Sequence, residues 1–254
     1  MDLFDISGSR VIVTGGSRGL GKGMAEGFLE AGCHVVIFGS SDKVADAERE
    51  FRGCGYDCTG IRVDLRKEEE RVWAYKQATD ILGGLDVLVN CAGIQRRHPA
   101  EEFPLNDWED ILQVNLTAAF RLSQMAAKTY LAKDKPYGKI INIASMLSFF
   151  GGYTVPAYAA SKGGMAQMTK AFCNELAGRG INVNALAPGY MATELNTALM
   201  DPENPRYQTI TDRIPTHRWG TGDDMKGAVI FLASHASDYI NGAVIPVDGG
   251  YLVR

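Results

Sequence analysis

The first structural signal in the chain is Val11-Ile12-Val13-Thr14-Gly15-Gly16-Ser17-Arg18-Gly19-Leu20-Gly21, an apolar β-branched run that leads into a glycine-rich turn. Glycines let a backbone curl and approach an anion closely, and a helix that starts after the turn offers unpaired N–H groups to a phosphate. We expect Gly15 and Gly19 to form the tight turn and Gly21 to let the helix pack on the sheet. An ordinary strand-to-helix loop is the alternative, because a glycine cluster alone is a weak signal.

Beyond this turn, short β-branched runs alternate with longer amphipathic segments, which is typical of βαβ units and a parallel sheet. Strands are expected at residues 11–13, 35–38, 59–63, 87–89, 139–143, 181–186 and 244–247, and helices at 24–31, 43–52 and from about residue 66. Strands this apolar occur where helices cover both faces of a sheet. The sequence therefore predicts one α/β domain over residues 1–254. Residues 189–216 interrupt the alternation and are the candidate for a mobile substrate lid.

Composition excludes several classes of protein. The 254-residue chain has a net charge of −4 and no long basic run, which argues against a nucleic-acid partner. No stretch reaches the roughly 18 apolar residues of a membrane span, and the N-terminus lacks the apolar run of a signal peptide. Five scattered cysteines and four dispersed histidines show neither a disulfide framework nor metal-ligand spacing. We expect reduced thiols, a cytoplasmic location and no metal.

The end of the second expected strand, Phe38-Gly39-Ser40-Ser41, bears on which nicotinamide dinucleotide would fit. A carboxylate at this place binds the adenosine ribose of NAD, and an arginine accommodates the 2′-phosphate of NADP. Neither is present, whereas Arg18 in the glycine turn is placed to reach a 2′-phosphate. We expect NAD, with NADP as the alternative.

Three later strand ends suit the rest of a dinucleotide, because ligands bind at the carboxyl ends of parallel strands. Asp64-Leu65 follows the third strand, and Asp64 is expected to accept a hydrogen bond from the adenine amino group; its alternative role is to cap the next helix. Asn90-Cys91-Ala92-Gly93 combines a close-approach backbone with an amide that can tie neighbouring strands together. Pro188-Gly189 is expected to shape the wall beside the nicotinamide.

Tyr158 and Lys162 are four positions apart, so on a helix they share one face. A tyrosine hydroxyl has a pKa near ~10 and is a poor base at neutral pH, but an adjacent cation stabilises the phenolate. Lowering that pKa by about two to three units needs roughly 3–4 kcal/mol, which a desolvated ammonium and a positive charge on a bound cofactor would supply. The alternative is a packed tyrosine beside a solvated lysine, and the pair alone favours it.

The order and spacing of these residues resemble the short-chain dehydrogenase/reductase family over essentially the whole chain. The resemblance is carried by the turn at residues 14–21, Asn90-x-Ala92-Gly93, Asn115, Ser145, Tyr158-x-x-x-Lys162 and Pro188-Gly189. It implies a single Rossmann-type domain, a doubly wound seven-stranded parallel sheet with helices on both faces, in a homotetramer. It also implies an NAD(P)-dependent oxidoreductase that acts on CH–OH groups.

The resemblance assigns four catalytic roles. Tyr158 would exchange a proton with the substrate oxygen, and Lys162 would lower the pKa of Tyr158 and hold the nicotinamide ribose. Ser145 would hydrogen-bond the same substrate oxygen, and Asn115 would order a water that connects Lys162 to solvent. Taken singly, Ser145 is equally typical of a strand-end cap and Asn115 of a helix kink. The residues implied to bind the cofactor are Gly15, Ser17, Arg18, Gly19, Leu20, Gly21, Ser40, Asp64, Leu65, Asn90, Ala92, Gly93, Tyr158, Lys162, Pro188, Gly189, Met191 and Thr193.

A narrower likeness within the family is to enzymes of open-chain sugar acids, the 2-dehydro-3-deoxy-D-gluconate 5-dehydrogenases and the gluconate 5-dehydrogenases. It is carried by the segments at residues 93–97, 141–149, 187–193 and 247–254. The expected substrate is therefore a small-molecule sugar acid. One of Arg96 and Arg97 would bind its carboxylate, solvated charge being the alternative for both. The full set of expected substrate contacts is Arg96, Arg97, Ser145, Met146, Tyr158 and Tyr190.

Two other functions remain open at the level of sequence. A 3-oxoacyl-carrier-protein reductase shares the fold and the four catalytic residues, and it needs a basic patch at the mouth of its site. A catalytically idle dinucleotide-binding scaffold would have lost at least one of Asn115, Ser145, Tyr158 and Lys162, and all four are present.

Overall fold

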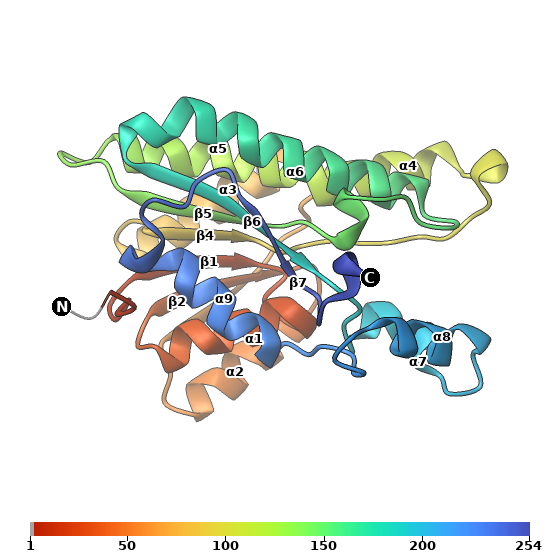
Figure 1. Ribbon diagram of the computed structural model, residues 1–254. Coiled ribbons are helices and arrows are strands. Elements are labelled where there is room, and N and C mark those ends of the chain that lie inside the picture. The colour runs from red at the N-terminus through yellow and green to blue at the C-terminus, as the bar shows by residue number, and fades with distance from the viewer. Residues whose placement is uncertain (1–2) are drawn as a thin grey trace.

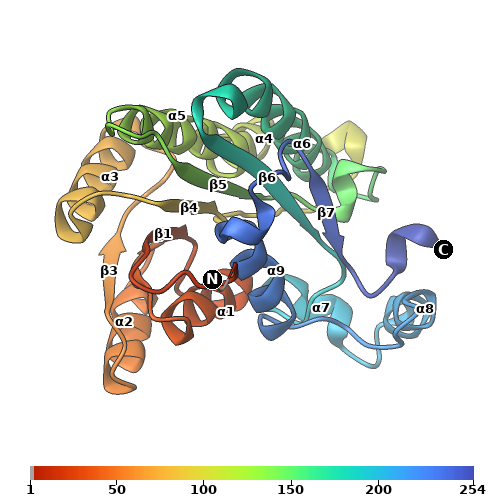
Figure 2. The ribbon, with the colours of Figure 1, turned by 60° about the vertical axis from the view of Figure 1, so that its left-hand side comes forward.

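The computed structural model describes residues 3–254, apart from the side chain of Leu195. It has three layers, a central sheet with helices packed on both faces (Figures 1 and 2). The sheet has seven strands, all parallel, in the order β3-β2-β1-β4-β5-β6-β7. Their bounds are β1 Arg10–Thr14, β2 His34–Gly39, β3 Cys58–Arg62, β4 Val87–Asn90, β5 Gly138–Ile143, β6 Ile181–Pro188 and β7 Val244–Val247. The predicted α/β fold and its seven strands are confirmed.

Alternate side chains of each strand enter two different cores, which explains why the strands are apolar throughout. Val11 and Val13 pack on one face against α1 (Gly19–Glu30), α2 (Lys43–Gly53) and α9 (Asp223–Ala233). Ile12 points to the opposite face, where it joins the core formed with α3 (Glu68–Leu82) and α5 (Ala118–Leu131). The long helix α6 (Pro156–Leu176) covers the same face beside α5, and α4 (Leu105–Leu112) packs against α6.

The direction of winding reverses between β1 and β4. From β1 the chain builds outward through β2 to β3, then crosses to the other side of β1 and continues from β4 to β7. The loops after β1 and β4 therefore diverge at the carboxyl edge of the sheet, which is where open α/β sheets bind ligands.

The stretch at residues 189–216, expected to be irregular, contains two short helices, α7 (Thr197–Met200) and α8 (Pro205–Arg213). Figure 1 shows them at the carboxyl end of the sheet, near the C-terminus of the chain. They pack on a small core of their own, made of Met146, Leu199, Ile210, Ile214, Trp219 and Tyr251. The prediction of an irregular segment was wrong in this respect, whereas its role as a lid stays a prediction.

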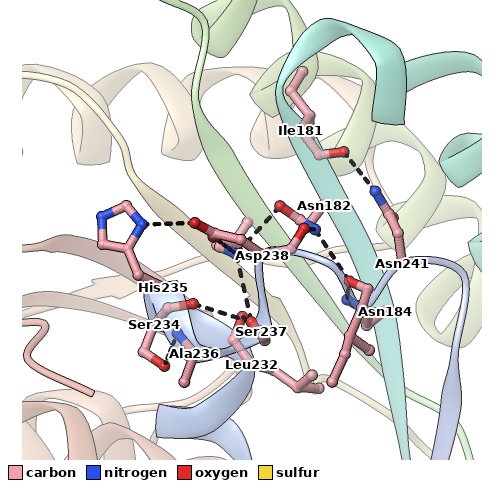
Figure 3. Close-up of polar contacts among 12 residues, drawn as sticks. Ile181, Asn182, Asn184, Leu232, Ser234, His235, Ala236, Ser237, Asp238 and Asn241 are labelled. Atoms are coloured by element: carbon pink, nitrogen blue, oxygen red, sulfur yellow. Dashed lines mark hydrogen bonds and ion pairs between the residues drawn. The ribbon is translucent and has the colours of Figure 1, made fainter. Parts of the chain in front are cut away.

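Asparagines fix the last part of the chain onto β6 at the opposite end of the sheet (Figure 3). Asn182 Nδ2 donates to the carbonyl oxygens of Asp238 and Ile240 at 2.9 and 3.0 Å. Asn241 Oδ1 accepts from the backbone N–H of Val183 at 2.8 Å. In the same region the buried Lys139 Nζ lies 2.7 Å from Asp238 Oδ1. These contacts give hydrogen-bond partners to backbone groups of β6 and of the loop before β7 that would otherwise have none.

No helix in the described part of the chain combines the length and apolar character needed to cross a membrane.

Candidate active site

A cavity of about 580 Å³ opens at the carboxyl edge of the sheet. It runs from the glycine turn after β1 to the start of α6, so both predicted halves of the site share one space. The predicted residues that line it are Gly15, Ser17, Arg18, Gly19, Leu20, Gly21, Ser40, Asp64, Leu65, Ala92, Gly93, Arg96, Ser145, Tyr158, Lys162, Pro188, Gly189, Met191 and Thr193. The structure thus brings together residues that lie between Gly15 and Thr193 in the sequence.

The glycine turn has the geometry that the sequence predicts. Gly15 has a φ of 70° and Gly19 a φ of 53°, values that residues other than glycine rarely adopt. Gly21 is required for a different reason than expected, because a Cβ there would lie 2.1 Å from the carbonyl oxygen of Gly15. Gly21 thus lies close to the backbone of the turn itself. The first residues of α1, Gly19, Leu20 and Gly21, line the cavity, where helix N–H groups can bind an anion.

Two predicted cofactor residues have structural contacts that refine their roles. Asp64 Oδ1 accepts from the backbone N–H of Arg66 at 3.0 Å, whereas α3 begins after Lys67 without a side-chain cap. Asp64 is therefore a turn residue on the cavity wall, and the helix-cap alternative is wrong. Asn90 does not line the cavity: its Nδ2 donates to Asn142 Oδ1 at 2.8 Å and to Ser123 Oγ at 3.0 Å. Its amide ties β4 to β5, as the sequence predicts, and contact between Asn90 and a cofactor stays a prediction.

At the end of the cavity beside the glycine turn, Arg18 shares an acidic partner with Lys43, and the sequence singled out neither that partner nor Lys43. Arg18 Nη1 lies 2.5 Å from Glu194 Oε2, and Lys43 Nζ lies 3.2 Å from Glu194 Oε1. The two cations hold the pKa of Glu194 below its usual range. Glu194 comes from the segment at residues 189–216 and also lines the cavity. Lys43 and Glu194 are 151 positions apart, so no local pattern could have paired them.

Tyr158 and Lys162 lie on the same face of α6, at the end of the cavity away from Arg18. Lys162 Nζ lies 5.6 Å from the centre of the Tyr158 ring and donates to the carbonyl oxygen of Ile143 at 2.6 Å. Lys162 is 3% exposed although it carries an ammonium. Lysines are almost never fully buried without an acidic partner, and Lys162 has none among the described residues, so a buried lysine that lines this cavity is a candidate functional group.

Burial shifts the pKa of both Tyr158 and Lys162. For Tyr158 the shift is upward, whereas the sequence predicts a lowered pKa. Desolvation raises the pKa of Tyr158 to about 12, while a hydrogen bond with Ser145 acts in the opposite sense. Desolvation lowers the pKa of Lys162 to about 8. The field of Lys162 therefore does not by itself produce a phenolate at neutral pH. At neutral pH Tyr158 is therefore protonated, beside a lysine whose pKa is about 8.

Asn115 lies in a π-helical turn, Gln113–Thr117, that joins α4 to α5. It is fully buried, and its Oδ1 accepts from the N–H of Ile94 at 2.8 Å while its Nδ2 donates to Ser161 Oγ at 3.1 Å. Asn115 therefore lies in a distorted helix and also contacts Ile94, a residue that lines the cavity. Short π-helical turns often occur at functional sites. A Cβ on Gly93 would lie 3.5 Å from Asn115 Oδ1 and 3.9 Å from Lys162 Nζ, so the two side chains flank the same glycine.

Ser145 and Met146 follow β5 directly but face different surroundings. Ser145 lines the cavity, and its Oγ also accepts from the N–H of Leu147 at 3.1 Å, which is the capping role. Met146 is 5% exposed and packs in the small core under α7 and α8. Tyr190 joins the edge of that core, with its ring 5.1 Å from the ring of Tyr251. Met146 and Tyr190 are not among the residues that line the cavity, and their expected contact with a substrate stays a prediction.

The two adjacent arginines after β4 have different partners. Arg96 Nη1 lies 3.2 Å from carboxylate oxygens of both Asp107 and Asp110, so its charge is neutralised. Arg97 has no acidic partner within the described residues. Its Nη1 donates to the carbonyl oxygen of Tyr153 at 3.5 Å, and the amide oxygen of Gln95, suitably turned, accepts from its Nη2 at 2.9 Å. Arg97 is not among the residues that line the cavity, and of the two arginines it is the one without a carboxylate partner in the described part of the chain.

No group of three or more His, Cys, Asp and Glu side chains gathers as a metal site would require in the described part of the chain.

Comparison with known proteins places this geometry in a family. The family model for short chain dehydrogenases matches residues 9–204. The chain is 44% identical to 2-dehydro-3-deoxy-D-gluconate 5-dehydrogenase of Escherichia coli (strain K12), covering all of this chain and 99% of that protein. It is 42% identical to the Bacillus subtilis (strain 168) protein of the same name, with 100% and 98% covered. A crystal structure of a gluconate 5-dehydrogenase from Burkholderia cenocepacia J2315 with NADP and tartrate is 40% identical, with a TM-score of 0.94 over 100% of this chain and 98% of that one. The chain belongs to the short-chain dehydrogenase family.

Proposed function

We propose that the protein is an NAD(P)-dependent oxidoreductase that interconverts a secondary alcohol and a ketone on an open-chain sugar acid, most closely 2-dehydro-3-deoxy-D-gluconate at C5. The observation that carries the proposal is the shared cavity, which has the glycine turn at one end and Ser145, Tyr158 and Lys162 at the other. The names of the E. coli and B. subtilis relatives support the choice of substrate.

The residues at the end of the cavity away from the glycine turn have different roles in the reaction. The nicotinamide, when bound, supplies or accepts the hydride. Tyr158 gives its proton to the carbonyl oxygen in reduction and takes it back in oxidation, and Ser145 donates a hydrogen bond to the same oxygen. Lys162 holds the nicotinamide ribose and offers positive charge to the phenolate. Asn115 holds the loop at Ile94 against α6 and, with Lys162, borders the space beside Gly93.

The adenosine end supports NADP rather than the NAD that we expected from the sequence. Arg18 lines this end of the cavity with Ser17 and Ser40, and Lys43 contacts Glu194, which lines it too. β2 carries no carboxylate. The negatively charged 2′-phosphate of NADP would bind these two cations. The uncharged 2′-hydroxyl of NAD would not, so with NAD the two cations would have Glu194 as their acidic partner. The NADP in the B. cenocepacia structure agrees with this proposal.

We also propose a homotetramer in the cytoplasm. Phe120 on α5 is 43% exposed and its ring meets that of Phe172 on α6 edge-on at 5.8 Å, so the outer face of this helix pair carries apolar surface suited to a second copy. All five cysteines are free, as in a reducing compartment. Light scattering on the purified protein tests the tetramer.

The decisive test is a steady-state assay across a panel of sugar acids and their keto derivatives with both cofactors. The panel includes an acetoacetyl thioester, because an acyl-carrier-protein reductase would prefer it. We expect the highest kcat/KM on a six-carbon keto sugar acid, and Tyr158→Phe should lose at least about 100-fold in kcat, the scale of general acid–base catalysis, while it binds NADP as the wild type does. Preference for the thioester, or full activity of Tyr158→Phe, would contradict the proposal.

A further inference from the structure

Ser161, in the turn of α6 between Tyr158 and Lys162, carries a buried hydroxyl to which the proposed mechanism gives no role. Its Oγ donates to the carbonyl oxygen of Tyr158 at 2.7 Å and accepts from Asn115 Nδ2 at 3.1 Å. The residue is 0% exposed. One hydroxyl thus connects the side chain of Asn115 to the backbone of the residue that carries the reacting phenol.

The side chain of Asn115 uses both of its N–H groups. Its Nδ2 donates to the carbonyl oxygen of Ile94 at 3.0 Å and to Ser161 Oγ, while its Oδ1 accepts from the N–H of Ile94. Since an amide nitrogen carries two hydrogens, loss of the Ser161 hydroxyl would leave one buried N–H without its partner, which is unfavourable. Asn115 would then be free to move, and Ile94, which lines the cavity, would move with it.

Tyr158 is the third residue of α6, so its position depends on how firmly the first turn of that helix is held. The N-cap residue is Val155, whose apolar side chain offers no oxygen to the first N–H groups. Thr154, just before it, has a φ of 62°, a left-handed conformation that is strained for a β-branched residue. Helix ends fray readily, so the link from Tyr158 through Ser161 to Asn115 anchors this turn.

About two turns further along α6, Thr169 has nearly the same contacts but is not among the residues that line the cavity. Its Oγ1 donates to the carbonyl oxygen of Met165 at 2.8 Å and accepts from Asn142 Nδ2 at 2.9 Å, and it too is 0% exposed. Removal of either hydroxyl leaves a buried asparagine N–H unpaired, so the structural cost is shared. Only Ser161 is bonded to two of the proposed catalytic residues.

We propose that Ser161 is a positioning residue, whose hydroxyl holds Tyr158 and Asn115 in the relative position that proton transfer requires. The inference rests on the proposed function, because it takes Tyr158 to exchange a proton with the substrate. That exchange requires hydrogen-bond distance between the two oxygens, and a displacement of about 1 Å can lower a rate about 100-fold. Because Ser161 is bonded to the backbone of Tyr158, its loss should alter the geometry of the site and leave the phenol itself intact.

Steady-state kinetics of Ser161→Ala, on the substrate of the panel that the wild type turns over best, test the inference. We expect kcat to fall about 10- to 100-fold, the scale of a small misplacement of a catalytic group, with KM and the Kd for NADP changed less than about threefold. Ser161→Cys places a weak donor in nearly the same space and should also lose kcat, whereas a role in packing alone would leave it near the wild type. Thr169→Val, the matched control, removes a hydroxyl of the same kind and should keep the kcat of the wild type.

Three outcomes would overturn the inference: the kcat of the wild type in either Ser161 variant, an equal loss of kcat in Thr169→Val, or a Kd for NADP weakened as much as kcat in Ser161→Ala. The last two indicate a structural role. Urea unfolding and the binding of one NADP per chain show that the rates come from folded sites. Failure of the proposed function looks different, because the wild type would then prefer the thioester, and the same variants would be compared on that substrate.

Discussion

Replacing Glu194 by glutamine should strengthen the binding of NADP and leave that of NAD nearly unchanged. Glu194 contacts Arg18 at 2.5 Å and Lys43 at 3.2 Å, the same two cations that the 2′-phosphate of NADP would bind. The phosphate must therefore displace a carboxylate that already occupies them. NAD carries no such phosphate, so its binding does not require Glu194 to leave.

The size of the effect follows from the exposure of the groups. All three side chains are more than half exposed, so each of the two ion pairs is weak. Loss of both pairs should tighten the Kd for NADP by about 2- to 30-fold. Salt screens exposed charges over roughly 8–10 Å, so the difference should shrink as ionic strength rises.

Calorimetric titration of wild type and Glu194→Gln with both cofactors, at low and high salt, measures this difference. Glu203→Gln removes the same charge from an exposed position between α7 and α8 and is the matched control. An unchanged or weaker Kd for NADP in Glu194→Gln would refute the competition. A weaker Kd for NAD would show instead that Glu194 accepts a hydrogen bond from the ribose.

Two further predictions concern buried lysines. Because the pKa of Lys162 is lowered to about 8, its ammonium loses its proton as pH rises through that value. The affinity for NADP should therefore fall between about pH 7 and 9 in the wild type, and in Lys162→Met it should be weak and independent of pH. The same dependence on pH in both proteins would contradict this. Asp238→Asn leaves the ammonium of Lys139 buried without a carboxylate and should lower the free energy of unfolding by about 1–3 kcal/mol at neutral pH, less than for a fully buried pair because Asp238 is half exposed. Burial lowers the pKa of Lys139, so the unfolded chain binds more protons at high pH and stability rises there. Urea unfolding should therefore show a smaller loss near pH 10 than at pH 7, and an equal loss would count against the buried cation.

Local patterns were sufficient for the strands and for the residues at their ends. Each strand is a short β-branched run, and the carboxyl ends of parallel strands necessarily meet at one edge, so Gly15, Ala92 and Gly189 share a cavity. The helices α7 and α8 were missed because they are too short to be stable alone. They form where Leu199 and Ile210 find Met146 and Trp219, contacts that no local window contains.

The charge contacts at the two ends of the site were not predictable for the same reason. Glu194 belongs to the segment whose path the sequence left undefined, so its partners Arg18 and Lys43 depend on tertiary packing. Arg96 and Arg97 are neighbours in sequence, and only the structure shows which is neutralised. One signal was available: Asp107 and Asp110 are three residues apart and therefore share a face of α4, a pair suited to holding a cation.

Burial at the inner end of the site prepares the two directions of the reaction unequally. With a pKa of about 12, Tyr158 keeps its proton at neutral pH and can donate it to a carbonyl oxygen without prior change. Oxidation of an alcohol needs the phenolate, which burial disfavours and nearby positive charge stabilises. Lys162, whose Nζ lies 5.6 Å from the centre of the Tyr158 ring, supplies that charge below about pH 8. Ketone reduction thus depends on the burial of Tyr158, and alcohol oxidation depends on Lys162 remaining charged beside it.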